Sequence, residues 1–313
     1  IMLDWDKVTD PSKAIPFDAY AKAFKLGLNA FEIPKEYGGS KVDLATAAVM
    51  YEEMGYYDGN FASVMQTTNL ALKPVLIGGT PEQVQYFSKH ILEGKGYACF
   101  CLTEPQSGSD ASNVKTTAVK DGDEWVINGE KCFITNGNVA DTFVVIAVTG
   151  KTVDKRGRSM KEISAFIVEK DDKGFSQGKH EKKMGIRGSS TCDLIFEDCV
   201  IPKDRMLGKK GEGFKIAMKT LDGGRIGIAS QALGLGEGAV EEAIKYTKER
   251  VQFGKRISQF QNTQFQLAEM HTRMQAAQFL VYSAAMKKQN HEPYSMDAAM
   301  AKLFAAEAAS DVT

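Results

Sequence analysis

The stretch VKTTAVKDGDEWVING, residues 114–129, decides the fold because it is typical of short strands joined by tight turns. The runs Val114–Val119 and Glu124–Ile127 flank Asp121-Gly122, a dipeptide that favours a two-residue hairpin. Asn128-Gly129 is the same kind of signal and predicts a second turn. Because no helical pattern separates the strands, they indicate antiparallel pairing rather than a sheet with crossover helices.

Further strands are predicted at Phe143–Val148, Ser164–Glu169 and Cys192–Phe196. The polar and basic stretch Lys151–Lys161 predicts an exposed loop. Strands at this short spacing favour an antiparallel barrel or sandwich, which we assign to residues 98–205 as a middle β-domain.

Residues 1–97 predict an N-terminal helical domain. Apolar residues recur every three or four positions at Phe17, Tyr20, Phe24 and Leu28. A strong helix start follows at Thr80, with Pro81 at the first helical position and Gln83 able to bond back to the cap. This helix is expected to end before Gly94. Since the chain begins at Ile1 without an initiator methionine, upstream residues are expected to be missing, and Ile1–Trp5 does not resemble a signal peptide.

Residues 206–313 predict a C-terminal helical bundle. Its apolar seam consists of Phe260, Leu267, Met270, Met274, Ala277, Val281 and Ala284. Ser295 is a candidate cap for a further helix that is still running at Thr313, so the bundle is expected to be incomplete. The predicted class is α+β, mostly α, with three domains.

Composition excludes several classes of function. The chain has 313 residues, 43% hydrophobic and 25% charged, with a formal net charge of -1. Such a balance gives no single-sign field for nucleic acid or an anionic membrane. The longest apolar run, Phe143–Val148, is too short to span a bilayer. We therefore expect neither a nucleic-acid partner nor a membrane span.

Cysteine and histidine spacing predicts no metal site. The five cysteines form no C-x-x-C pair and the four histidines show no ligand spacing. An odd number of cysteines without a signal peptide is typical of reduced thiols in a cytosol-like compartment.

Two segments carry possible ligand chemistry. CLTEPQSGSD, residues 101–110, could offer backbone N–H groups to an anion or to an electron-rich ring edge, although it could also be a turn between domains. KCFITNG, residues 131–137, places Phe133 two residues before Thr135, on one face of a strand. The ring could lie on a planar ligand whose polar edge the hydroxyl reaches; the alternative is a core Phe and an ordinary strand Thr.

A third segment, TLDGGRIGI at residues 220–228, lies inside a helical pattern. Two adjacent glycines there cost about 1 kcal/mol each relative to alanine, which indicates a close approach to the backbone. Asp222 and Arg225 are spaced to meet on one helical face, where a surface ion pair is the alternative to a binding role.

Taken together, these segments resemble the acyl-CoA dehydrogenase family. KMGIR at 183–187, LIFEDCVIP at 194–202 and RVQFGK at 250–255 stand in the family's order, and the resemblance covers essentially the whole chain. Residues 222–231 and 298–303 are most similar to the short-chain (butyryl-CoA) members. The resemblance implies a helical domain, a β-domain and a four-helix bundle, with FAD between the last two.

The resemblance implies the following FAD-binding positions. Thr103 and Ser109 match side-chain contacts to the flavin and its pyrophosphate, Phe133 the aromatic on one flavin face, and Thr135 the hydroxyl near N5. Many members have Trp at the position of Phe133. Arg250 and Gln261 match groups that reach the FAD of a neighbouring subunit, which implies a homo-oligomer, a tetramer in the family. The full set is Phe100, Cys101, Leu102, Thr103, Gly108, Ser109, Phe133, Ile134, Thr135, Arg250, Phe253 and Gln261.

The implied acyl-CoA contacts are Ser109, Asp222, Gly223, Gly224 and Arg225. The catalytic base stays unknown. The family's glutamate in a Tyr-Glu-Gly segment is expected to lie beyond Thr313, and the alternative family position is Gly224. We discount Glu104, which precedes Pro105 in a segment with a structural role in the family.

The implied activity is FAD-dependent α,β-dehydrogenation of a short-chain acyl-CoA to the trans-2-enoyl-CoA in fatty acid metabolism. Electrons would pass to electron-transferring flavoprotein, in a bacterial cytoplasm by preference or in a mitochondrial matrix. The alternatives are an enoyl-CoA reductase running in reverse, an acyl-CoA oxidase, and a non-catalytic CoA-binding protein on the same scaffold. The sequence leaves the acyl-chain length and branching, the direction and the electron partner open.

Overall fold

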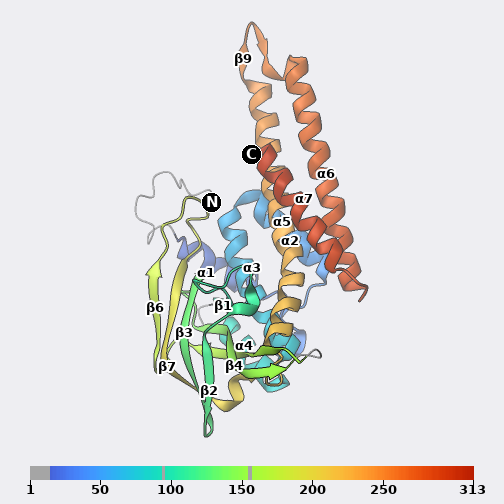
Figure 1. The fold of residues 1–313 in the computed structure, drawn as a ribbon. Coiled ribbons are helices and arrows are strands. Elements are labelled where there is room, and N and C mark those ends of the chain that lie inside the picture. Colours follow the sequence, from blue (N-terminus) through green and yellow to red (C-terminus); the bar gives the residue numbers. More distant parts are fainter. Residues whose placement is uncertain (1–14, 94–95, 154–156) are drawn as a thin grey trace. The chain divides into compact units, whose positions relative to one another are not determined.

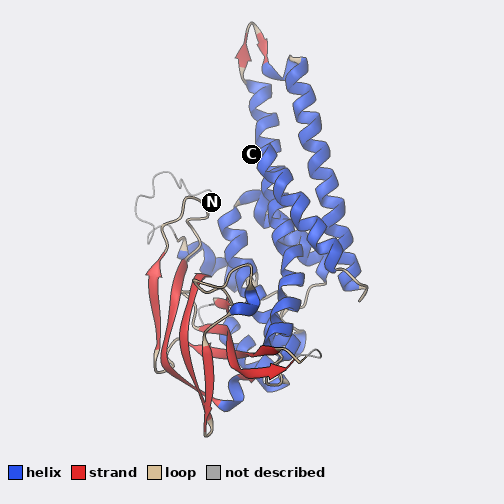
Figure 2. Ribbon diagram, in the orientation of Figure 1, coloured by secondary structure: helices blue, strands red, loops and turns tan. Residues whose placement is uncertain are grey.

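The computed structural model describes residues 15–93, 96–153 and 157–313. Helices come first along the chain, a group of strands follows, and long helices come last (Figure 1 and Figure 2). This confirms the predicted α+β class, with a β-region between two helical regions. The sequence interpretation of Ile1–Trp5 concerns residues outside those described.

The chain forms two compact units. Among the described residues, the sheet unit contains 15–41 and 64–221, and the bundle unit contains 42–63 and 222–313. The three domain boundaries expected from the sequence stay a prediction, because the units group residues by contact and not by chain order.

The sheet unit takes its helices from the first part of the chain. Helix α1 contains three of the four predicted apolar positions: Tyr20 is buried, Phe24 is half-buried and Phe17 is exposed. The fourth, Leu28, lies after the end of the helix. The start of α4 is the predicted capping box: the Gln83 amide donates to Thr80 Oγ1 at 3.3 Å, and the Thr80 amide donates to Gln83 Oε1 at 2.9 Å. The helices are α1 (Phe17–Lys25), most of α3 (Gly59–Gly78), α4 (Pro81–Glu93) and the start of α5 (Gly213–Glu249), with short 3-10 turns at Lys35–Tyr37, Ala111–Asn113 and Lys203–Arg205.

Eight strands form one sheet in the order β6-β7-β3-β2-β4-β5-β8, with β1 beside β4. Neighbouring strands run antiparallel, as predicted, except that β4 pairs in parallel with both β1 and β2. The strands are β1 (Ala98–Cys101), β2 (Thr117–Asp121), β3 (Glu124–Thr135), β4 (Thr142–Val153), β5 (Ser159–Glu169), β6 (Phe175–His180), β7 (Thr191–Pro202) and β8 (Met206–Leu207).

The second turn predicted at Asn128-Gly129 is wrong, because β3 continues through it with a shift in register. Gly129 has φ 145°, and a Cβ there would lie 2.6 Å from Thr116 Oγ1. Asn128 Nδ2 donates to Asp198 Oδ1 at 3.0 Å, and the Asp198 amide donates to Asn128 Oδ1 at 2.8 Å. The dipeptide therefore stays within β3, and the extra residue at this shift in register lies on β7, where Asp198 is bonded to Asn128.

The exposed loop predicted at Lys151–Lys161 is largely a strand hairpin. Strands β4 and β5 pair as far as Val153 and Ser159, while residues 154–156 lie outside the described chain. Lys161 Nζ donates to the carbonyls of Asn113 at 2.9 Å and Val114 at 2.8 Å. The ends of these two strands are exposed and mostly polar on both faces. They therefore lack the alternation of apolar and polar residues that identifies a strand, and the sequence resembled a loop.

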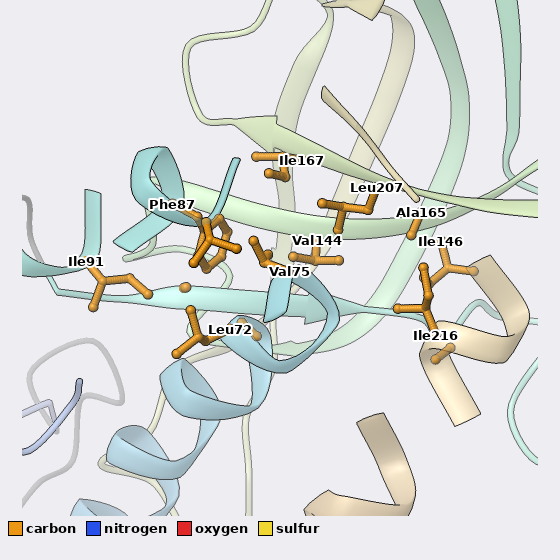
Figure 3. Packing of buried hydrophobic residues seen from close by; sticks show 14 of the residues in the cluster. Leu72, Val75, Phe87, Ile91, Val144, Ile146, Ala165, Ile167, Leu207 and Ile216 are labelled. Carbon is orange, nitrogen blue, oxygen red and sulfur yellow. The ribbon is translucent and has the colours of Figure 1, made fainter. Parts of the chain in front are cut away.

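The core of the sheet unit lies where helices α3 and α4 meet strands β4 and β5. Figure 3 shows the side chains of these elements gathered between helix and sheet. Their removal from water is the main driving force for this packing. The labelled residues are Leu72, Val75, Phe87, Ile91, Val144, Ile146, Ala165, Ile167, Leu207 and Ile216.

The bundle unit contains α2 (Leu44–Tyr57), the rest of α5, α6 (Gln261–Gln289) and α7 (Ser295–Val312) (Figure 1). A small hairpin, β9 (Val251–Gln252) and β10 (Lys255–Arg256), and a 3-10 turn, Ile257–Gln259, connect α5 to α6. The inner part of the predicted seam is buried at Met274, Ala277, Val281 and Ala284, while Phe260, Leu267 and Met270 are half-buried.

Ser295 is not the cap that the sequence predicted. It lies inside the first turn of α7, whose cap position is Tyr294. Its hydroxyl donates instead to Asp222 Oδ2 at 2.9 Å, on another helix of the same unit. None of the helices formed by the described residues is long and apolar enough to cross a membrane.

Candidate functional site

The structure brings the two sequence segments with possible ligand chemistry into direct contact within the sheet unit. The Cys132 amide donates to the Thr103 carbonyl at 2.9 Å. Beside it, Lys131 Nζ donates to the Leu102 carbonyl at 3.1 Å and to Glu104 Oε1 at 2.7 Å. Three consecutive loop residues are thus held by two consecutive strand residues from a distant part of the sequence.

A bulge in β3, directly after these contacts, exposes an aromatic ring. Lys131 pairs with Leu194 and Ile134 with Cys192, so β3 carries one extra residue here. Phe133 takes up the bulge with φ 57° and is 64% exposed. A large apolar ring on left-handed backbone and in solvent contradicts the alternative of a core Phe, and such strain is typical of functional positions.

Two threonines are candidates to bind a ligand together with Phe133: Thr103, in the loop bonded to β3, and Thr135, two residues after Phe133. Thr103 and Thr135 are half-buried, whereas Ile134 is buried and faces the interior. Because residues alternate across a strand, Phe133 and Thr135 are both more exposed than Ile134, as expected for one shared ligand face. Cys101 is fully buried within β1, and Phe100 and Leu102 are half-buried.

The loop after β1 closes into a tight turn and leaves its tip open. The Glu104 amide donates to the Ser107 carbonyl, and the Ser107 amide returns a bond to the Glu104 carbonyl, both at 3.0 Å. Gly108 and Ser109 are exposed, and a Cβ at Gly108 would meet no atom within 4 Å. A tight turn is therefore present within the sheet unit, and the open tip of the loop, Gly108 and Ser109, leaves room for a ligand.

Glu104 is unsuited to act as a base. Its side chain is 1% exposed. Oε1 also accepts from the Thr116 amide at 3.0 Å, and Oε2 accepts from the Lys115 amide and from Gln106 Nε2, each at 2.6 Å. Burial acts to raise the pKa of Glu104, but the Lys131 ammonium and these donors outweigh it and hold the pKa below its usual range. A carboxylate held in this way is structural.

In the bundle unit, Asp222 and Arg225 form the ion pair expected from their spacing. Their side chains are 29% and 43% exposed, and Ser295 also binds the Asp222 carboxylate. The close approach predicted at the adjacent glycines is made by Lys288, since a Cβ on Gly223 would lie 2.5 Å from Lys288 Nζ. The helix there admits no side chain at Gly223 without displacing Lys288.

The remaining predicted positions surround the β9–β10 hairpin in the bundle unit. Phe253 lies at its tip with φ 51° and is 91% exposed, followed by Gly254 with φ 76°. Both residues take the left-handed conformation that a two-residue hairpin turn requires. Arg250 precedes the hairpin and Gln261 begins α6, and both are exposed. These three side chains are available to an outside partner.

Sequence reasoning missed Lys131, although it is the residue that joins the two segments. Its partner Glu104 lies 27 residues away, and no local spacing rule connects a strand lysine with a loop glutamate. Among the described residues there is no group of three or more His, Cys, Asp or Glu side chains that could hold a metal. The five cysteines are free and buried.

Comparison with known proteins identifies the family. The chain matches the models of the N-terminal, middle and C-terminal domains of acyl-CoA dehydrogenases over residues 2–95, 99–199 and 211–313. It therefore belongs to the acyl-CoA dehydrogenase family and is a flavin-dependent oxidoreductase, as the resemblance of its motifs predicted.

Two relatives show which members it is similar to. It is 46% identical to a short-chain-specific acyl-CoA dehydrogenase of Clostridium acetobutylicum, over 97% of this chain and 79% of that protein. It is also 43% identical to the CarC subunit of the caffeyl-CoA reductase-Etf complex of Acetobacterium woodii, over 97% of this chain and 79% of that protein.

Solved structures agree with both the fold and the cofactor. Butyryl-CoA dehydrogenase from Megasphaera elsdenii matches with a TM-score of 0.90 and 42% identity, over 98% of this chain and 81% of that chain. An acyl-CoA dehydrogenase from Bacillus anthracis complexed with FAD matches with a TM-score of 0.86 and 33% identity, over 95% and 54%. FAD is the cofactor of this protein. The exposed ring of Phe133 suits a planar ligand, and the open backbone at Gly108 suits a phosphate group.

Proposed function

We propose that the protein dehydrogenates short-chain acyl-CoA thioesters between the α and β carbons to give trans-2-enoyl-CoA. The observation that carries this proposal is the contact of the two segments, where Cys132 bonds Thr103 and the next residue, Phe133, is exposed two residues before Thr135. FAD bound there would supply the acceptor for the β-hydride. The names and high identity of the short-chain relatives support the substrate class.

The residues of the sheet unit would hold and orient the flavin. The Phe133 ring offers a flat apolar surface, and Thr103 and Thr135 offer hydroxyls to polar ring atoms. The open tip at Gly108 and Ser109 would admit the pyrophosphate close to the backbone. Phe100, Cys101, Leu102 and Ile134 would complete the cofactor contacts, mainly through backbone and apolar groups, since they are buried or half-buried.

The acyl-CoA would be bound by Ser109 and by the segment Asp222–Arg225. The Arg225 guanidinium carries a permanent charge and several donors, which suits the anionic and carbonyl-rich parts of the ligand. Its ion pair with Asp222 would orient it. Donors aimed at the thioester carbonyl would stabilise the charge that develops as the α-proton passes to a carboxylate base, which none of the residues assigned above supplies.

Arg250, Phe253 and Gln261 would bind the FAD of a neighbouring subunit. Their exposure on and beside the β9–β10 hairpin supports this role, since an exposed Phe at a turn tip is typical of an interface. The protein would then be a homo-oligomer, a tetramer by analogy with the family. Its place of action would be a bacterial cytoplasm by preference, or a mitochondrial matrix.

Electron-transferring flavoprotein is the proposed electron partner, because one relative is a subunit of a reductase-Etf complex. The same relative is named as a reductase, and it favours a second candidate: the reverse reaction, in which an enoyl-CoA is reduced. The two directions use the same contacts and the same alignment of substrate and flavin, so kinetics must distinguish them.

The test uses the natural full-length protein. It should purify yellow, release FAD on denaturation, lose its visible flavin absorbance rapidly when mixed anaerobically with butyryl-CoA, and recover it on addition of electron-transferring flavoprotein. Faster oxidation of the reduced protein by crotonyl-CoA than reduction by butyryl-CoA would favour the reductase. Recovery by dioxygen with formation of peroxide would indicate an oxidase. Release of FMN, or no flavin at all, would contradict the proposal.

A further inference from the structure

Among the described residues, the most deeply buried ion pair of the sheet unit joins the two flavin segments and has no role in the proposed reaction. Lys131 Nζ lies 2.7 Å from Glu104 Oε1, and the side chains are 0% and 1% exposed. Lys131 comes from strand β3 and Glu104 from the loop after β1. By contrast, Lys203 and Asp123 form an ion pair in the same unit with side chains that are 56% and 83% exposed.

The Lys131 ammonium restrains the loop on both sides of Thr103. It donates to the carbonyl of Leu102 and to the carboxylate of Glu104, which are the residues before and after Thr103. The Thr103 carbonyl itself accepts from the amide of Cys132, the next residue of the strand. The position of Thr103 relative to β3 is therefore fixed by three bonds from two adjacent residues.

Glu104 extends the same restraint to the far end of the loop. Its carboxylate accepts the backbone amides of Lys115 and Thr116 at 2.6 and 3.0 Å. Because a buried amide must have a partner, removal of this carboxylate would leave the buried Thr116 amide unsatisfied and would release the part-buried Lys115 amide. Glu104 thus joins both ends of the loop to the strand that carries Phe133.

Energetics argue against simple stabilisation as the purpose of this pair. A buried ion pair often stabilises a fold no better than apolar side chains of similar volume, because both charges must leave water. Apolar side chains cannot form directional hydrogen bonds. They would therefore not hold the carbonyl of Leu102 or the amides of residues 115 and 116 in place. The pair is therefore better suited to setting a geometry than to adding stability.

We infer that Lys131 and Glu104 are positioning residues that set the geometry of the flavin site by holding Thr103 against the bulge at Phe133. This inference rests on the proposed binding of FAD at these segments. Lys131 lies directly before the bulge, so its place in the core determines where the Phe133 ring emerges relative to the Thr103 hydroxyl. Neither residue touches substrate or flavin in this role.

The experiment compares Lys131→Met and Glu104→Gln with the wild-type full-length protein. Met keeps the length of the lysine stem, and Gln keeps the shape and one acceptor of the glutamate. The apoproteins are titrated with FAD, and the visible spectrum and reduction potential of the bound flavin are recorded beside thermal unfolding. We expect Lys131→Met to weaken FAD binding about tenfold or more and to shift the flavin bands, because small misplacements in such sites have effects of this size.

Glu104→Gln should give a smaller effect in the same direction, about threefold in FAD affinity, because amide oxygens accept weaker bonds than a carboxylate. It also keeps the inference testable if Lys131→Met does not fold. The matched control is Lys203→Met, which removes the lysine of the exposed pair with Asp123. It should leave FAD affinity, spectrum and potential unchanged.

The outcomes separate this inference from the proposed function. If the wild-type protein binds no FAD at all, the proposed function fails first. If it binds FAD and both variants match it in affinity, spectrum and potential while folding cooperatively, the pair is merely structural and the inference is overturned. A spectrum and potential altered in Lys131→Met and Glu104→Gln, but not in Lys203→Met, would support it.

Discussion

The sheet unit and the bundle unit each bury a glutamate, and the two carboxyl groups have different kinds of partners. Glu104 of the sheet unit faces a full counter-ion, Lys131, and its pKa is held below the usual range. Glu52 of the bundle unit is 7% exposed and accepts bonds from two neutral groups, Gln278 Nε2 at 3.0 Å and the Tyr282 hydroxyl at 2.7 Å.

A second acid next to Glu52 makes the contrast sharper. Burial, followed by the negative charge of Glu52 and then of Glu53, raises the pKa of Glu237 to about 7. A counter-ion lets a buried carboxylate keep its charge at every physiological pH. Glu52 has these neutral donors and a second carboxyl group next to it, and the pKa of Glu237 is near neutrality, so the bundle unit should respond to pH where the ion pair of the sheet unit does not.

The largest expected effect comes from breaking the ion pair on one side. Lys131→Met should lower the free energy of unfolding by about 3–5 kcal/mol, because it leaves the Glu104 carboxylate buried without a counter-ion. Urea unfolding followed by circular dichroism measures this loss. The double variant with Glu104→Gln should recover part of it, since the remaining side chain is neutral. A loss below about 1 kcal/mol in the single variant would show that the pair is replaceable.

Protonation of Glu237 should contribute a smaller amount to the free energy of unfolding at low pH. We expect about 1–2 kcal/mol, because the side chain is partly exposed and water screens its interactions. Since its pKa is raised from 4.5 to about 7 on folding, its stabilising contribution is complete below pH 4.5 and is lost as the pH rises through 7. Glu237→Gln should therefore flatten the decline in stability across this window.

Thermal unfolding of both proteins at several pH values checks the Glu237 prediction. The control is Glu242→Gln on the same helix, whose side chain is 74% exposed and pairs with Lys245. It should keep the wild-type pH profile. An unchanged profile in Glu237→Gln would mean that some other group controls the response.

The smallest effect on stability is expected at the exposed pair of the bundle unit. Arg225→Ala should cost about 0–1 kcal/mol, because water screens a pair of this exposure. Turnover of acyl-CoA by the full-length protein should nevertheless fall about tenfold or more if Arg225 contacts the ligand. Steady-state kinetics and urea unfolding, measured on the same preparations, separate the two effects.

Arg273→Ala provides the matched control for Arg225. Its side chain is also 43% exposed and pairs with Glu269 and Asp311 in the same unit. Its loss should have a similar small effect on stability and none on turnover. If both variants turn over acyl-CoA at the same rate, Arg225 and Asp222 form only a surface ion pair with no role in binding.

Local rules predicted the parts of the fold that depend on neighbours in sequence. The capping box at Thr80, the hairpin at Asp121-Gly122 and the burial of Met274 through Ala284 follow from propensities and spacings within a few residues. The same rules failed where a distant strand or helix competes for the same groups. Asn128-Gly129 binds Asp198 in place of turning, and Ser295 binds Asp222 in place of capping its helix.

The sequence by itself determined the α+β class, the order of the segments and, through the resemblance of its motifs, the family and its cofactor. These properties follow from short sequence patterns and motifs, which can be recognised without the rest of the chain. Only the tertiary structure decided that a bulge exposes Phe133 and that Lys131 holds Leu102 and Glu104 from the strand beside them. The physical reason is that a buried charge such as that of Lys131 needs a counter-ion close to it in space. Tertiary packing supplies Glu104, which is 27 residues away in the sequence.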